Sequence, residues 1–368
     1  MNTRQLDPRR IPNRFRLQTL IEEEIILADA SLKEKPAEQH RTADLANIIL
    51  TLLEVGRWEK VLEYASLLLT REHSKTVDQQ DNEAMATAYY ALATRERELN
   101  QVEAAYKNYA EARKLNPSPW LSSNLFRNVG LVYLKEKKFA EAAKEFHQGV
   151  AFTEQHPELR GALPALYNYW GLALTRAALQ AKQDPSEGLK IFEQTTQLYR
   201  TIFTEMQVSE TEQARSHDWQ SHQFHRGMVL CEITEQMIND KSVETQVIEK
   251  NLRSAEKLLL GSLEGRIVNK ADGQRLGDVC VWLGRVYTGL HLFDNARTYL
   301  LRARGYFHTF FKEDDTVSQT KDVDARLAAL PIAINSSPLQ LHSAFATEKV
   351  NPITMDMSVT SNKTSPAP

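Results

Sequence analysis

The side chains best suited to chemistry lie in the stretch HDWQSHQFH, residues 217–225. On a straight helix Asp218, His222 and His225 share one face, because successive members are four and three residues apart, and such carboxylate and imidazole groups can bind a metal ion. His217 does not share that face. The alternative is a solvated helix start, where Asp218 interacts with the free backbone amides of the first turn. We expect the helix start and predict neither a metal nor another cofactor.

No other stretch indicates catalysis. The sequence lacks the HExxH, CxxC and GxSxG motifs and the phosphate-binding GxxxxGK[ST] motif. Its two cysteines, Cys231 and Cys280, are flanked by apolar residues, which predicts buried free thiols. We therefore expect a protein that is not an enzyme. A metal-dependent enzyme that uses Asp218, His222 and His225 is kept as an alternative.

The composition indicates a folded, helical chain. Of its 368 residues 42% are hydrophobic, and its 14 Gly and 13 Pro are few for a protein of many strands and turns. A net charge of −3 gives no electrostatic reason to expect nucleic-acid binding. No run approaches the roughly 18 consecutive apolar residues of a membrane span, and the first residues do not resemble a targeting signal. We expect a cytoplasmic protein without membrane insertion.

Three regions follow from the sequence. Residues 1–40 hold a polar start and then an amphipathic stretch at 15–33, which we interpret as a flexible start and an N-terminal capping helix. Residues 41–330 are a succession of helix-length segments with short breakers between them. Residues 331–368 are rich in Ser, Thr, Pro and Asn and have no helical period, which predicts a disordered tail.

The helix-length segments repeat one pattern. Val129, Gly130 and Tyr133 lie on one face of a helix, and Ala142 and Phe146 form a matching face on the next. The small residue of the first helix recurs at Ala93, Gly130, Gly171 and Gly284. Because glycine inside a helix costs about 1 kcal/mol relative to alanine, its recurrence indicates helices that cross closely at that point, with alanines such as Ala142 on the second helix.

This pattern resembles the tetratricopeptide repeat, a helix-turn-helix unit with small residues where its two helices cross. The resemblance covers residues 41–307 and implies an all-α, irregular, right-handed superhelix, an α-solenoid, of about six helix pairs. Three units match the pattern clearly. A first unit has Ile49 at the small position, another has Gly188 and Phe192 late, so that QAKQDPSEG lengthens its turn, and a pair between 218 and 263 fits by length alone.

The resemblance also implies a binding surface. In the family the inner wall of the superhelix, formed by the first helix of each pair, binds peptides. Residues here at the matching wall positions are candidates to contact a protein or peptide partner, and each of them could instead pack between units. The candidates are Tyr90, Thr94, Asn124, Arg127, Asn128, Asn168, Tyr169, Trp282 and Arg285.

Family members that bind the C-terminal carboxylate of chaperones use lysine, asparagine and arginine from three successive units. Here Asn128 matches the central asparagine, but Tyr90, Thr94, Ala165 and Tyr169 stand where the other ligands are expected. Chaperone-tail binding is therefore not expected. The sequence favours a non-catalytic adaptor or scaffold for a protein or peptide, and a peptide-sensing regulator that switches a second partner is a further alternative.

Overall fold

The computed structural model describes residues 41–54, 57–70, 79–239, 243–311 and 318–331. The capping helix expected at 15–33 and the tail expected beyond 331 lie outside these residues. The described part of the chain is helical and contains no β-strand, which confirms the all-α prediction. None of its helices is long and apolar enough to cross a membrane.

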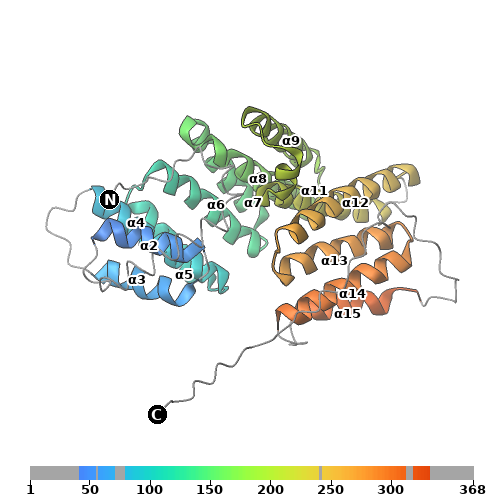
Figure 1. Cartoon of the computed structure of the whole chain (residues 1–368). Coiled ribbons are helices and arrows are strands. Elements are labelled where there is room, and N and C mark those ends of the chain that lie inside the picture. The colour runs from blue at the N-terminus through green and yellow to red at the C-terminus, as the bar shows by residue number, and fades with distance from the viewer. Residues whose placement is uncertain (1–40, 55–56, 71–78, 240–242, 312–317, 332–368) are drawn as a thin grey trace, which may run out of the picture. The chain divides into compact units, whose positions relative to one another are not determined.

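Twelve of the helices form six pairs in chain order (Figure 1). The pairs are α2 (Thr42–Glu54) with α3 (Trp58–Thr70), α4 (Gln79–Glu98) with α5 (Val102–Lys114), α6 (Pro119–Lys135) with α7 (Phe139–Glu154), α8 (Leu163–Ala181) with α9 (Ser186–Glu205), α11 (His217–Asn239) with α12 (Thr245–Val268), and α13 (Gly273–Gly289) with α14 (Phe293–Phe310). The pair inferred between 218 and 263 by length alone is confirmed. Shorter elements are η3 (Pro157–Ala162), α10 (Glu210–Arg215) and the last helix, α15 (Ser318–Ala329).

The pairs stack on one another in sequence order. Successive first helices contact each other, in the order α2, α4, α6, α8, α11 and α13. Each second helix of the first five pairs also contacts the first helix of the next pair. Helix α15 continues the stack on α14. This is the contact pattern of an α-solenoid, in which each unit buries its apolar face only against its neighbours. The handedness of the superhelix stays a prediction.

Most first helices end in one kind of turn. Asn100, Lys137, Lys182 and His291 have left-handed backbone, with φ between 54° and 61°. The amide after each donates to the carbonyl five residues earlier, as Lys138 N does to Tyr133 O at 2.9 Å. This bond satisfies a carbonyl that the helix end leaves open, and it turns the chain back for the second helix.

Large side chains on the second helices fill the space between the helices of a pair. The largest fully buried side chains include Tyr109, Phe146, Phe192 and Phe307, which come from α5, α7, α9 and α14. Each lies in a core cluster with residues of the preceding first helix or of the next pair. Cys231 and Cys280 are buried free thiols, as predicted.

The small residues lie at the helix crossings, with one difference from the expected contact. A Cβ on Gly130 would lie 2.5 Å from Cε1 of Phe146, and one on Gly284 would lie 2.7 Å from Cγ of Leu300. The nearest atoms thus belong to the large residue one turn after the alanine, and not to Ala142 or Ala296 as the sequence suggested. The glycine leaves room for that ring or side chain.

We expect Gly130→Leu to overpack this crossing and to lower the free energy of unfolding by about 1 to 3 kcal/mol, despite the better helix propensity of leucine. Urea denaturation followed by circular dichroism measures the change. An unchanged midpoint and slope would contradict the tight packing of Gly130 against Phe146.

The prediction of a lengthened turn at QAKQDPSEG was wrong. Helix α8 continues to Ala181, and only residues 182–185 separate it from α9. The inserted residues therefore extend the first helix, because the preceding stretch LTRAALQA consists mainly of good helix formers. Gly188 and Phe192 appear late in the sequence because α8 is long.

Candidate functional site

The candidate residues lie on the first helices and divide into two groups. Tyr90, Thr94, Asn128 and Asn168 are at most 8% exposed. These four residues therefore pack between units, as the alternative stated, and their polar groups bond inside the protein. The partly exposed group is Asn124, Arg127, Tyr169, Trp282 and Arg285.

Asn128 connects α4 to α6. Its Nδ2 donates to the hydroxyl of Tyr90 at 3.0 Å, and Nη1 of Arg97 donates to its Oδ1. Thr94 shares a hydrogen bond of 3.0 Å with Tyr109 of the same pair. The bonds of Asn128 fix α4 against α6, and the bond between Thr94 and Tyr109 fixes α4 against α5, because breaking one would leave a buried polar group without a partner.

Asn168 connects α8 to both candidate metal-binding histidines of α11. Nδ1 of His222 donates to its Oδ1 at 3.2 Å, and its Nδ2 donates to Nδ1 of His225 at 2.9 Å. Nε2 of His222 faces the hydroxyl of Thr196 at 2.9 Å. Asp218 lies in the first turn of α11, as the helix-start interpretation predicts.

The expectation of a solvated stretch was wrong for His222, whose side chain is 1% exposed. Burial, together with the positive charge of nearby Arg226, lowers the pKa of His222 to about 3. Burial also lowers the pKa of His225 to about 3, with Arg266 and Arg176 acting in the same direction. Both imidazoles are thus neutral hydrogen-bonding groups at pH 7. Among the described residues, no group of three His, Cys, Asp or Glu side chains could hold a metal ion.

Arg127 and Tyr169 lie on neighbouring first helices, α6 and α8. Burial raises the pKa of Tyr169, and the positive charge of Arg127 opposes this shift. The side chain of Arg127 makes no hydrogen bond or ion pair with another described residue. Asn124 donates to the carbonyl of Trp120 at 2.9 Å, on its own helix. On the surface of α6 and α8, the partly exposed guanidinium of Arg127 therefore has hydrogen-bond donors that no described residue accepts.

Trp282 and Arg285 of α13 act together. The guanidinium carbon of Arg285 lies 3.7 Å from the ring centre of Trp282, and its Nε donates to Glu235 of α11 at 2.9 Å. Its Nη2 donates to the other oxygen of the same carboxylate. Burial alone lowers the pKa of Arg285, but the hydrogen bonds and charge of Glu235 raise it above its ordinary value. A bidentate pair stacked on an aromatic ring holds the guanidinium in one plane.

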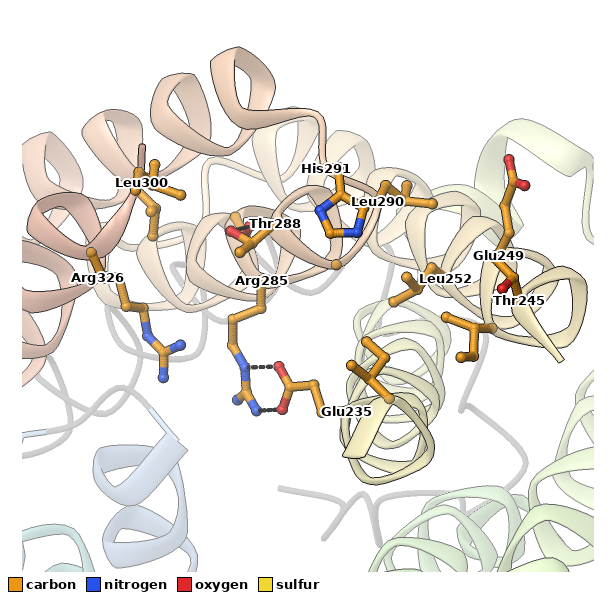
Figure 2. A pocket seen from close by; sticks show the side chains of 16 residues that line it. Glu235, Thr245, Glu249, Leu252, Arg285, Thr288, Leu290, His291, Leu300 and Arg326 are labelled. Atoms are coloured by element: carbon orange, nitrogen blue, oxygen red, sulfur yellow. Dashed lines mark hydrogen bonds and ion pairs between the residues drawn. The ribbon is translucent and has the colours of Figure 1, made fainter. Parts of the chain in front are cut away.

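Arg285 lines a cavity of about 680 Å³ formed by α11, α12, α13, α14 and α15 (Figure 2). This volume falls in the range of about 300 to 1,000 Å³ that is usual for small-ligand sites. Six of its sixteen lining residues have large aliphatic side chains: Ile238, Ile248, Leu252, Leu290, Leu300 and Leu330. Gly284 and Gly289 of α13 also line it, and their missing side chains leave room beside Leu300 and Leu252.

Charged and polar side chains lie among these aliphatic residues. Besides the Arg285–Glu235 pair, the cavity is lined by Glu249, His291 and Arg326. Arg326 comes from α15, and its Nε donates to Asp322 on the same helix at 2.8 Å. The sequence indicated Arg285 but not Glu235 or Arg326. Glu235 lies two turns after Gly227, the glycine of α11 that packs against Leu259 of α12, and so lies beyond the wall positions of the family pattern. Helix α15 follows the last recognisable unit.

No family model matches the chain, and no curated protein sequence matches it. Among solved structures, the chain is similar to BtubC (BKLC) from P. vanneervenii. The two share 15% sequence identity with a TM-score of 0.44, and the alignment covers 78% of this chain and 97% of that one. A likeness at this level carries no argument about function.

Proposed function

We propose that this chain is a non-catalytic scaffold that binds a peptide segment of a protein partner, and that it is related to the tetratricopeptide repeat proteins. The observation that carries the proposal is the cavity at the end of α11 and α13, with an aliphatic wall and a fixed guanidinium group. Apolar walls with a few oriented polar groups are typical of binding sites. Six helix pairs, four of them with a glycine where the two helices of the pair meet, support the family relation.

We infer that partly exposed side chains of the first helices also contact the partner. Arg127 and Tyr169 are partly exposed on α6 and α8, and Trp282 and Arg285 on α13. Aromatic and arginine side chains are the types that contribute most to binding at protein interfaces. The hydrogen bonds of Asn128 and Asn168 between first helices hold this surface in place before a partner binds, which reduces the entropy that binding costs.

Thr288→Trp tests the proposal, because Thr288 is exposed and lines the cavity. A display library of random peptides would be selected on the full-length chain, and the affinity of each recovered peptide measured by fluorescence anisotropy. We expect the indole to fill the opening and to weaken these peptides by at least about tenfold, or about 1.4 kcal/mol.

The matched control is Thr298→Trp. Thr298 is also exposed and, like Thr288, donates its hydroxyl to the carbonyl four residues earlier, but it lies on α14 and does not line the cavity. It should leave affinity unchanged. Peptides that bind both variants as well as the parent chain would refute binding in the cavity. If they were lost only with Arg127→Glu, the site would lie on α6 and α8.

A further inference from the structure

We propose that the cavity recognises a peptide in which an aliphatic side chain lies next to a side-chain carboxylate. This inference rests on the proposed function and adds the chemistry of the ligand. Its two parts are the aliphatic wall of the cavity and the guanidinium groups of Arg285 and Arg326.

Arg285 has hydrogen-bond donors to spare. A guanidinium group carries five N–H donors. Nε and Nη2 of Arg285 donate to Glu235, whereas Nη1 donates to no described residue. Because the pair with Glu235 and the contact with Trp282 fix the plane of the group, the direction of the remaining donors is also fixed.

Arg326 adds a second set of donors from another helix. Its Nε donates to Asp322, and its two terminal nitrogens donate to no described residue. In Figure 2 the side chains of Arg285 and Arg326 extend in the same direction from α13 and α15. Two guanidinium groups on one side of a cavity suit an anionic acceptor, and carboxylate is the acceptor that a peptide side chain provides.

The acidic residues of the cavity do not accept hydrogen bonds from the remaining donors of Arg285 and Arg326. Glu235 already accepts two hydrogen bonds from Arg285, and Glu249 lies 4.0 Å from Arg253 on its own helix. A cationic ligand would find Glu235 already paired with Arg285. An acidic ligand would meet hydrogen-bond donors of Arg285 and Arg326 that no described residue accepts, which favours it.

The aliphatic wall determines which side chain of the peptide is favoured next to its carboxylate. Leu252 and Leu300 are at most 1% exposed and close the inner side of the cavity, while Ile238 on its outer side is 44% exposed. Covering an exposed isoleucine and filling the inner space removes apolar surface of both partners from water. Leucine, isoleucine or methionine side chains match this wall in size and polarity.

The test is a double-mutant cycle on the full-length chain. The probes are N-acetylated, C-amidated synthetic peptides that carry Leu-Glu or Leu-Gln in a Gly/Ser background, together with the peptides recovered from the display library. The protein change is Arg326→Gln, which removes the charge of a partly exposed side chain whose ion pair lies within α15. We expect the Leu-Glu peptide to bind about tenfold more tightly than Leu-Gln to the parent chain, and this ratio to fall in the variant to the smaller value that Arg285 alone supplies.

Further binding measurements distinguish the remaining explanations. Peptides that Thr288→Trp blocks, but whose Glu and Gln forms bind equally, would overturn the acidic preference and leave the proposed function intact. If no peptide depends on Thr288, binding in the cavity is refuted and this inference fails with it. A requirement for a free C-terminal carboxylate would overturn the side-chain assignment. Octanoate binding that depends on Arg326, without peptide binding, would overturn the peptide class.

Discussion

Replacing Gly188 with alanine is expected to lower the free energy of unfolding by about 3 kcal/mol, although alanine is the better helix former. A Cβ at Gly188 would lie 2.2 Å from Oγ1 of Thr175, 2.7 Å from the backbone nitrogen of Thr175 and 2.9 Å from the carbonyl oxygen of Gly171. Two of these three atoms belong to the backbone of α8. A side chain can rotate away from an inserted methyl group, but a backbone can only move with its whole helix.

Replacing Gly305 with alanine should instead raise the free energy of unfolding. A Cβ there would meet nothing within 4 Å, and Gly305 lies inside α14. Alanine should therefore stabilise the chain by up to about 1 kcal/mol through helix propensity and the lower entropy of the unfolded state. Urea denaturation of both variants, followed by circular dichroism, measures the two changes. Equal effects of the two substitutions would show that the α8–α9 crossing is not tightly packed.

These glycines show why the helix pairs could be predicted. Each unit of a solenoid packs mainly on its neighbours, so the requirements of a crossing appear within one short stretch of sequence. Gly130 and Phe146 belong to one helix pair, and their spacing repeats at Gly284 and Leu300. The contact itself was assigned to the wrong residue, because periodicity gives the shared face but not which of two neighbouring side chains fills the gap.

The candidate site was harder to predict, because its contacts join different helix pairs. Arg285 and Glu235 are 50 residues apart in the sequence, and Asn168 and His222 are 54 apart. Neither separation follows from a helical period. The residues at the wall positions all lie on first helices, but only the structure shows that Asn168 is used internally while Arg285 lines a cavity. Arg326 lies beyond the repeated pattern.

The Asn168–His222–His225 network should make the chain sensitive to acid. An unfolded histidine has a pKa of about 6.5, whereas those of His222 and His225 in the folded chain are lowered to about 3. As the pH falls below about 6.5, both histidines bind protons in the unfolded chain, whereas His222 and His225 stay neutral in the folded chain. Stability is therefore fully present above about pH 6.5 and is lost as the pH falls toward 3, by about 1.4 kcal/mol per pH unit for His222.

One carboxyl group opposes this trend. Burial raises the pKa of Asp278 to about 6, above the ordinary value of an aspartate, while Arg266 lowers it. Protonation of Asp278 therefore favours the folded chain as the pH falls from about 6 toward 4, and offsets part of the loss from the histidines. The total pH dependence of stability is for this reason a poor test of the network. The difference between the parent chain and a variant of His222 is a good one.

His222→Gln should remove the acid sensitivity that His222 supplies. Glutamine keeps a donor and an acceptor for Asn168 and Thr196 but takes up no proton in this range. Between pH 6 and pH 4 we expect the parent chain to lose about 1.4 kcal/mol more per pH unit than the variant, as measured by urea denaturation at several pH values. His147→Gln is the control, because it removes an exposed histidine and leaves the network intact. If both variants changed the pH profile equally, the buried imidazole could not be the source of the effect.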